Sequence, residues 1–359
     1  MDNTNSAWMI YGVNGYTGRL CAEEALRRGL RPVVAGRSAD RVARVAGELG
    51  LPHRVFDVVD VKAAAAGLEG MAAVLNCAGP FSATARPMLD ACVAAGIHYL
   101  DVTGEIGVFE HVHQNSARWK DAGIVALPGV GADVVPTDCM AAMLKEVLPG
   151  AVMLTLAFKT AKGHLSPGTA KTVVESLGGG PTLRRNGVLI SVPMASLSRM
   201  IPYGDGAALS AAIPWGDVST AFYSTGIPDI VVYTAMPEDQ LRMMRRMGPF
   251  LPILGLAPVR YLLKRLVEWR VTGPDAVKRG EDTTEFYGEA ADAAGNRAVM
   301  TLHAPNGYTL TYDAAVSAVD EVLKGAVAPG AHTPSTAFGA SFLSRVNDVR
   351  ITPPAIVPA

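Results

Sequence analysis

Three glycines near the start of the chain are spaced to bind a phosphate group. Gly12, Gly15 and Gly18 follow an apolar run at residues 8–11 and precede residues with helical spacing. Glycines at a strand-to-helix turn let the backbone approach a pyrophosphate, which then lies at the helix N-terminus. We therefore predict a dinucleotide-binding loop, and a glycine-rich turn without a ligand is the alternative. The predicted contacts are Gly12, Asn14, Gly15, Tyr16, Thr17 and Gly18.

A basic residue follows the second apolar run, where a nucleotide ribose would lie. Folds that prefer NAD place Asp or Glu here to hold the ribose 2′-hydroxyl. This chain has Arg37 instead, which can pair with the 2′-phosphate of NADP, while Ser38 donates a hydroxyl. Arg41 lies one helical turn further on and can assist. The sequence therefore predicts NADP (NADPH) as the cofactor, held here by Gly36, Arg37, Ser38 and Arg41; a solvated surface arginine is the alternative.

A third loop follows the apolar run 73–76. Ligands of parallel sheets bind beyond the carboxyl ends of the strands, so this loop is expected to line the ribose and nicotinamide. An ordinary strand-to-helix loop is the alternative. The predicted contacts are Cys77, Ala78, Gly79, Pro80 and Phe81.

Candidates for proton transfer lie beyond two later strands. Tyr99 and Glu105 fall at or just after the fifth apolar run, and Asp138 follows the sixth. We predict these three as catalytic candidates, with Thr103 and Gly104 as further cofactor contacts. The alternative is that Glu105 and its neighbours hydrogen-bond loops or cap the following helix, and that Asp138 caps a helix running to residue 148.

The elements that position these residues alternate regularly over the first third of the chain. Short apolar runs alternate with stretches of helical spacing, which indicates right-handed crossovers and a parallel, doubly wound sheet. We predict a Rossmann-type α/β domain over residues 1–135. The six expected strands are residues 8–11, 32–35, 53–56, 73–76, 98–101 and 124–127.

After residue 135 the alternation stops. Antiparallel strands are expected at residues 153–160, 288–290, 298–304 and 308–310, and an amphipathic helix at residues 314–324. We predict an α+β substrate and dimerisation domain over residues 136–325. Residues 326–359 are rich in Pro and Gly and are expected to form a loop-rich segment that packs back on the body.

One stretch, residues 243–269, combines apolar and basic residues. Residues 250–256 are apolar; arginines lie on both sides of them, and a lysine follows on the C-terminal side. Three prolines and two glycines within residues 243–269 argue against a single continuous helix. A lid over the substrate cleft or a homodimer contact is favoured over a segment that lies on a membrane surface.

Composition narrows the functional class. The chain has 359 residues, 49% of them apolar, and a net charge of -1, which gives no electrostatic case for nucleic-acid binding. None of the four cysteines forms a C-x-x-C pair, so no metal site is predicted. The polar first residues lack the basic region of a signal peptide, and a reduced cytoplasmic location is expected.

The motifs together resemble the saccharopine dehydrogenase-like oxidoreductases, and within that group the branch of the bacterial trans-acting enoyl reductases. The resemblance rests on the glycine loop and on residues 35–37, 76–81 and 99–105. Residues 128–138 are similar to that branch's P-G-F-D-S-V-P-S-D stretch, although Val130 replaces the aromatic residue and Gly131–Ala132 are inserted or shifted. Residues 333–339 also resemble the branch.

The resemblance implies a Rossmann domain, a second α+β domain and NADPH-linked reduction of a C=C (enoyl) or C=N (imine) bond. The expected substrate is a small biosynthetic or lipid-like intermediate. A saccharopine-type reductase of an amine–carbonyl adduct is an alternative, in which Arg184 and Arg185 are available to hold substrate carboxylates. A non-catalytic NADP-binding scaffold at a lipid surface is the alternative from another class.

Overall fold

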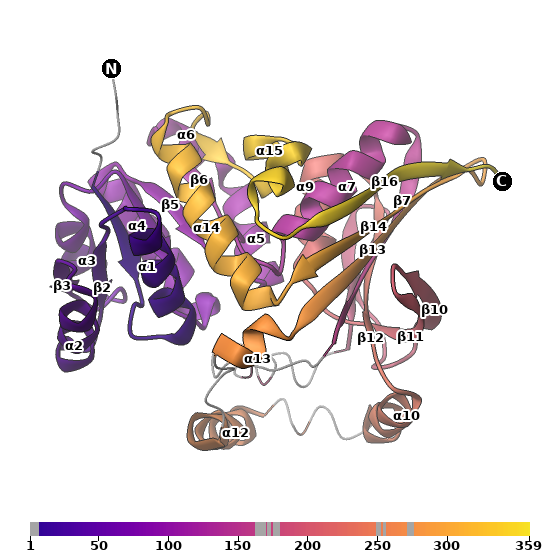
Figure 1. Cartoon of the computed structure of the whole chain (residues 1–359), viewed down its shortest axis with the longest axis horizontal. Helices are drawn as coiled ribbons and strands as arrows, with labels where there is room; N and C mark the ends of the chain where they lie inside the picture. Colours follow the sequence, from indigo (N-terminus) through magenta and orange to yellow (C-terminus); the bar gives the residue numbers. More distant parts are fainter. Residues whose placement is uncertain are drawn as a thin grey trace. The chain divides into compact units, whose positions relative to one another are not determined.

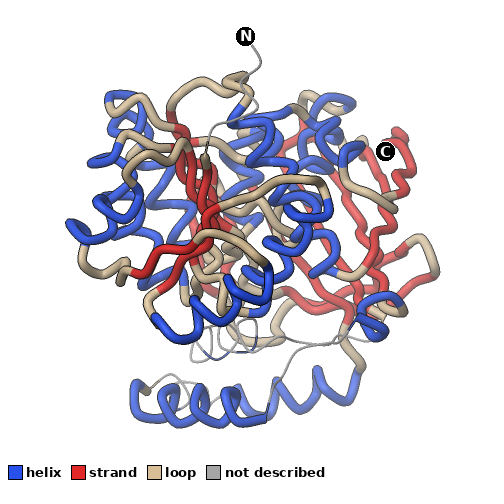
Figure 2. The backbone as a smooth tube through the Cα atoms, turned by 60° about the vertical axis from the view of Figure 1, so that its left-hand side comes forward, coloured by secondary structure: helices blue, strands red, loops and turns tan. Residues whose placement is uncertain are grey.

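The computed structural model describes residues 7–161, 180–248, 256–270 and 276–359, together with residues 170, 174 and 253. The chain forms two compact units (Figures 1 and 2). The first contains Met1–Val135 and Tyr308–Asn347, and the second contains Pro136–Gly307 and Asp348–Ala359. The chain therefore leaves the first unit and later returns to it, and the expected domain 136–325 and segment 326–359 differ from this division.

The first unit contains a parallel sheet in the order β15-β6-β5-β4-β1-β2-β3. Every pairing in it is parallel, as predicted for a doubly wound sheet. Residues of β1, β4 and β6 are buried on both faces, because helices cover both sides of such sheets, whereas the edge strand β3 is largely exposed. The strands are β1 (Trp8–Tyr11), β2 (Val33–Gly36), β3 (His53–Val55), β4 (Ala73–Asn76), β5 (His98–Asp101), β6 (Val125–Leu127) and β15 (Gly330–Ala331).

The helices of the first unit follow the strands, and three of these helices, like strand β15, come from the returning segment. α2 shows the usual basis for helix formation here, since Val42, Val45 and Ala46 lie buried on one face. The helices are α1 (Tyr16–Arg27), α2 (Ala39–Leu49), α3 (Val61–Leu68), α4 (Phe81–Ala95), α5 (Ile106–Gln114), α6 (Ser116–Asp121), α14 (Gly307–Leu323), α15 (Pro334–Phe338) and the 3-10 helix η2 (Ala340–Arg345).

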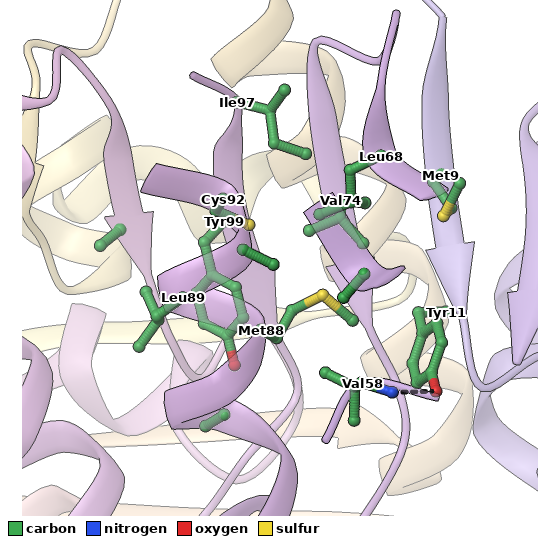
Figure 3. Close-up of a cluster of buried hydrophobic side chains, with 14 of the residues drawn as sticks. Met9, Tyr11, Val58, Leu68, Val74, Met88, Leu89, Cys92, Ile97 and Tyr99 are labelled. Carbon is green, nitrogen blue, oxygen red and sulfur yellow. Dashed lines mark hydrogen bonds between the residues drawn. The ribbon is translucent and has the colours of Figure 1, made fainter. Parts of the chain in front are cut away.

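One face of the first sheet packs on α3 and α4 through a continuous apolar core (Figure 3). Met88 and Leu89 of α4 are fully buried beside Tyr99 of β5. At the other end of the cluster the Tyr11 hydroxyl donates to Phe56 O (3.0 Å) and accepts from Val58 N (3.2 Å). This core fixes the strand ends from which the candidate loops emerge.

The second unit contains a nine-stranded sheet with the main path β10-β11-β12-β7-β13-β14-β16, to which the β8–β9 hairpin is joined through β12. Only the β7–β12 pairing is parallel. The strands are β7 (Ala151–Thr160), β8 (Thr182–Arg185), β9 (Val188–Ser191), β10 (Ser198–Tyr203), β11 (Gly206–Ala212), β12 (Asp229–Ala235), β13 (Thr283–Asp292), β14 (Arg297–Pro305) and β16 (Arg350–Val357). The helices are α7 (Val135–Val147), α9 (Asp217–Thr225), α10 (Glu238–Met247), α12 (Ala257–Arg270) and α13 (Ala276–Gly280).

Two expectations about the last part of the chain were wrong. Residues 308–310 lie in helix α14 and not in a strand, because Leu310 begins a buried helical face that continues through Ala314. The segment after residue 326 is not loop-rich throughout, since β16 pairs with β14. Prolines are tolerated in an edge strand, and Pro353–Pro354 fall where the β14–β16 register shifts.

Candidate functional site

The glycine loop after β1 is shaped by contacts that only glycine allows. Gly12 has a φ of +89°, and its N–H donates to Ala35 O at 2.7 Å. A Cβ at Gly12 would lie 2.9 Å from Ala78 N, and one at Gly18 would lie 2.4 Å from Gly12 O. Gly12 therefore makes the tight turn and Gly18 allows helix α1 to pack against it.

Gly15, between these two, faces solvent at the start of α1. It is the N-cap residue of that helix and offers no side-chain acceptor to the N–H groups of the first turn. Tyr16 and Thr17 follow it and are partly buried. A helix N-terminus with an exposed glycine in front of it suits an anion, because the N–H groups and the helix dipole both favour negative charge.

The end of β2 presents cationic donors beside this loop. The side chains of Arg37 and Arg41 are exposed, and neither makes a hydrogen bond or ion pair with any described residue. Ser38 is the N-cap of α2, and its hydroxyl makes no capping hydrogen bond. A Cβ at Gly36 would lie 2.9 Å from Asn14 Oδ1, so the glycine at this position lets Asn14 approach β2.

The third predicted loop, residues 77–80, is held by side chains at its two ends. Asn76 Oδ1 accepts from Ala78 N (3.0 Å), and Thr84 Oγ1 donates to Ala78 O (2.6 Å). Cys77, Ala78, Pro80 and Phe81 are partly buried and Gly79 is exposed. The neighbouring Cys21 thiol, together with burial, raises the pKa of the Cys77 thiol, so it stays protonated at neutral pH.

Glu105 serves as a cap for the helix that follows this loop. Its Oε1 accepts from Phe81 N (2.8 Å) and its Oε2 from Ser82 N (2.7 Å). Both donors belong to the first turn of α4, where a carboxylate satisfies unpaired N–H groups and complements the helix dipole. The alternative expected from the sequence was that Glu105 hydrogen-bonds loops or caps the following helix; the helix that it caps instead precedes it in the chain.

Tyr99 is fully buried and belongs to a hydrogen-bond network that includes the loops after β5 and β6. Its hydroxyl donates to Asp101 Oδ2 (2.6 Å), and Asp101 Oδ1 accepts from Thr103 N and Gly129 N, both at 2.9 Å. Burial raises the pKa of Tyr99 well above its usual value and that of Asp101 to about 6. The network joins the loop after β5 to the loop after β6.

Asp133 and Asp138 have different surroundings. Burial raises the pKa of Asp133 to about 6, and a Cβ at Gly104 would lie 2.8 Å from Asp133 Oδ2. Asp133 therefore sits directly against one of the predicted cofactor-binding residues. Asp138 belongs to the second unit, where it is fully buried in the first turn of α7.

Helix α14 brings two further residues to the carboxyl edge of the first sheet. The ring of Tyr308 meets that of Tyr16 edge-on, with centroids 4.9 Å apart. Thr311 Oγ1 accepts from Ala132 N at 3.0 Å in the loop after β6. These contacts join residues about 180 to 290 positions apart, and no local pattern in the sequence signals them.

The cationic residues considered for substrate carboxylates are engaged elsewhere in the second unit. Arg184 is buried, donates from Nε to Val218 O (2.7 Å) and from Nη1 to Gly187 O (2.8 Å), and lies over the ring of Phe222. Arg185 contacts Asp229 at 3.4 Å.

The parallel sheet, its strand order and the glycine loop define a dinucleotide-binding α/β domain. Residues 8–127 match the family model described as the saccharopine dehydrogenase NADP binding domain. The whole chain also has the fold of a solved structure, the apo histidine-tagged saccharopine dehydrogenase (L-Glu forming) from Saccharomyces cerevisiae. The TM-score is 0.67 at 12% identity, over 98% of this chain and 100% of that one.

Two curated relatives illustrate the similarity in sequence. A Mycobacterium tuberculosis protein provisionally named a trans-acting enoyl reductase is 32% identical over 185 residues, which is 47% of this chain and 43% of the relative. The human saccharopine dehydrogenase-like oxidoreductase is 28% identical over 207 residues, covering 49% of this chain and 47% of the relative. The match thus spans about half the length of these relatives.

Proposed function

We propose that the protein is an NADPH-dependent reductase that delivers hydride to a C=C or C=N bond of a small biosynthetic or lipid-like molecule. The observation that carries the proposal is the glycine turn before α1 together with two exposed arginines, Arg37 and Arg41, which make no hydrogen bond or ion pair with any described residue. Gly12 and Gly18 allow the tight turn, and the exposed Gly15 leaves the N–H groups of the first turn of α1 without a side-chain cap. The arginines supply positive charge where a 2′-phosphate would lie.

The residues at the carboxyl edge of the first sheet have different roles in such a reaction. NADPH, when bound, supplies the hydride. The N-terminus of α1 binds the pyrophosphate, and residues 77–81, held by Asn76 and Glu105, line the nicotinamide half. The proton is supplied by Asp133, because a carboxyl group with a pKa near 6 at this edge can donate close to neutral pH.

The relatives support reduction as the reaction class. Proteins named for enoyl reduction and for saccharopine dehydrogenase-like oxidoreduction both match this chain. The engagement of Arg184 by backbone carbonyl groups weighs against a role in holding the carboxylates of an amine–carbonyl adduct. An enoyl or imine substrate with little negative charge therefore fits the described residues better.

The experiment has two stages. First, NADPH and NADH are titrated into the purified protein by fluorescence, and tighter binding of NADPH is expected. Second, NADPH consumption is measured with enoyl thioesters, cyclic imines and amine–carbonyl mixtures, and turnover with one of the first two is expected. Preference for NADH would overturn the cofactor assignment, and NADPH binding without turnover of any class would favour a non-catalytic scaffold.

A further inference from the structure

Helix α12 (Ala257–Arg270) exposes an apolar stripe that the proposed reaction does not use. Leu262, Leu266 and Trp269 are 70%, 46% and 75% exposed. Their spacing of four and three residues places them along one face of the helix. Large apolar side chains in such a row are costly in water, so the stripe indicates a surface that binds a partner.

The charge around the stripe identifies the chemistry of that partner. Arg265 lies within the same two turns as Leu262 and Leu266, and its side chain is exposed. The whole chain carries a net charge of -1, so the positive charge of α12 is a local concentration. The helix contains Arg260, Lys264, Arg265 and Arg270 against the single acidic residue Glu268.

We propose that α12 is an interfacial helix that docks on an anionic lipid surface. Leucine and tryptophan along one face of a helix whose charged residues are mostly arginine and lysine is the composition of helices that lie in the headgroup region. Tryptophan in particular favours that region, because its ring is apolar and its N–H is polar. Negatively charged headgroups complement the basic residues, and each basic residue near such a surface increases binding by about five-fold.

The helix can lie on a bilayer but cannot cross it. Its 14 residues span about 21 Å, and the hydrocarbon core is about 30 Å thick. Within the part of the chain that the structure describes, no helix has the length and apolarity needed for a transmembrane span. The sequence favoured a lid or a dimer contact for this region, and the exposure of the stripe on α12 shifts our interpretation to a lipid surface.

Trp269 provides a direct probe of docking. Of the chain's four tryptophans, Trp8 and Trp119 are buried and Trp215 is partly buried, whereas Trp269 is 75% exposed. The emission of wild-type protein should shift to shorter wavelength on addition of phosphatidylglycerol–phosphatidylcholine vesicles. The shift should be weaker with phosphatidylcholine alone or at high salt, and absent from Trp269→Phe.

Flotation with the same vesicles tests the stripe and its charge separately. Leu262→Asp should reduce binding at least about ten-fold, since it places a charge in the apolar contact. Val188→Asp, at a residue that is 62% exposed on β9 of the same unit, is the matched control and should bind like wild type. Arg265→Glu should weaken binding to anionic vesicles by more than about five-fold and leave the weak binding to neutral vesicles unchanged.

Two outcomes would overturn the proposal. One is wild-type protein that neither floats with anionic vesicles nor changes its Trp269 emission. The other is equal loss of flotation in Leu262→Asp and Val188→Asp. If light scattering also shows that Leu262→Asp converts a dimer into a monomer while wild type does not float, the stripe is a contact between two copies of the chain.

Discussion

Side chains at the carboxyl edge of the first sheet fall into two groups. Asn76, Asp101 and Glu105 hold backbone N–H groups of the surrounding loops, so their polar atoms are committed to building the site. Arg37 and Arg41 hold nothing among the described residues and face solvent. The first group sets geometry, and the second is available to a ligand.

Arg37→Ala tests the second group. A charge-assisted contact to a phosphate is worth about 1.5–3 kcal/mol, so NADPH affinity should fall about ten-fold or more while NADH affinity changes little. Arg44→Ala is the control, because Arg44 is also an exposed arginine, lies in α2 seven residues after Arg37, and only approaches Glu48 at 4.0 Å. Both constants are measured by fluorescence titration, and equal loss for NADPH and NADH would exclude a 2′-phosphate contact.

Glu105→Gln tests the first group. The neutral amide gives up one strong acceptor and the charge at the N-terminus of α4, so the free energy of unfolding should fall by about 1 kcal/mol. Glu23→Gln, which removes a charge from an exposed ion pair with Arg19, should cost less than about 0.5 kcal/mol. Chemical denaturation measures both. Unchanged stability with loss of NADPH turnover would instead make Glu105 the proton donor.

At the scale of elements, the junction of β1 and α1 depends on contacts too close for any side chain. Gly18 lies in α1 against Gly12 O, and this close approach sets the direction of the helix N-terminus. Gly47 also lies within a helix, α2, but nothing lies within 4 Å of a Cβ built there. A substitution at Gly47 therefore tests helix propensity alone, whereas a substitution at Gly18 also tests packing.

Substitution of these glycines by alanine should have opposite effects. Gly47→Ala should stabilise the protein by about 1 kcal/mol, because alanine favours the helix. Gly18→Ala should destabilise it despite the same propensity gain, since its Cβ would lie 2.4 Å from Gly12 O, and NADPH affinity should fall as the loop shifts. Thermal unfolding of both variants measures the difference, and a gain in both would mean that the junction is not tightly packed.

The elements also show which features could be read from the sequence. The six strands β1–β6 were predictable because most of them are short, largely apolar runs between turn residues; β3, with the sequence His-Arg-Val, is the exception. The first turn of α14 was not, because Asn306–Gly307 has the composition of a hairpin turn. The contacts of Tyr308 and Thr311 depend on how distant segments meet. The roles of Arg37 and the glycine loop toward a nucleotide stay predictions that binding experiments will test.

At the scale of the whole molecule, the first unit is closed by the returning segment. Arg28 of α1 pairs with Asp313 of α14 and donates to Ser317 Oγ at 2.8 Å. Asp313 also accepts from Asn347 N at 2.7 Å, at the end of that segment. The free energy of unfolding of the first unit therefore depends on buried ionisable groups, and it is expected to change with pH as those groups titrate.

Asp101→Asn should change that pH dependence. The pKa of Asp101 is raised from 3.8 to about 6, so the folded protein binds more protons than the unfolded chain between these values, and this group lowers stability as pH rises through them. An asparagine keeps an acceptor for Thr103 N and Gly129 N. Relative to wild type, its free energy of unfolding should rise between pH 4 and 6, by roughly 3 kcal/mol at most.

The comparison with wild type isolates this group. His113, whose pKa burial lowers to about 4, contributes in the opposite direction, but equally in both proteins. Denaturant unfolding at several pH values supplies the measurement. Parallel curves for the two proteins would show that Asp101 is ionised in the folded state over the whole range.

The position of β15 bears on how the protein is made. β15 pairs with β6, although about two hundred residues separate them, and the second unit's sequence is translated in between. On the ribosome β6 therefore remains an open sheet edge until about two hundred further residues have been translated. The nascent first unit must wait for β15 before its sheet is complete, which makes the vectorial order of synthesis part of how this fold is reached.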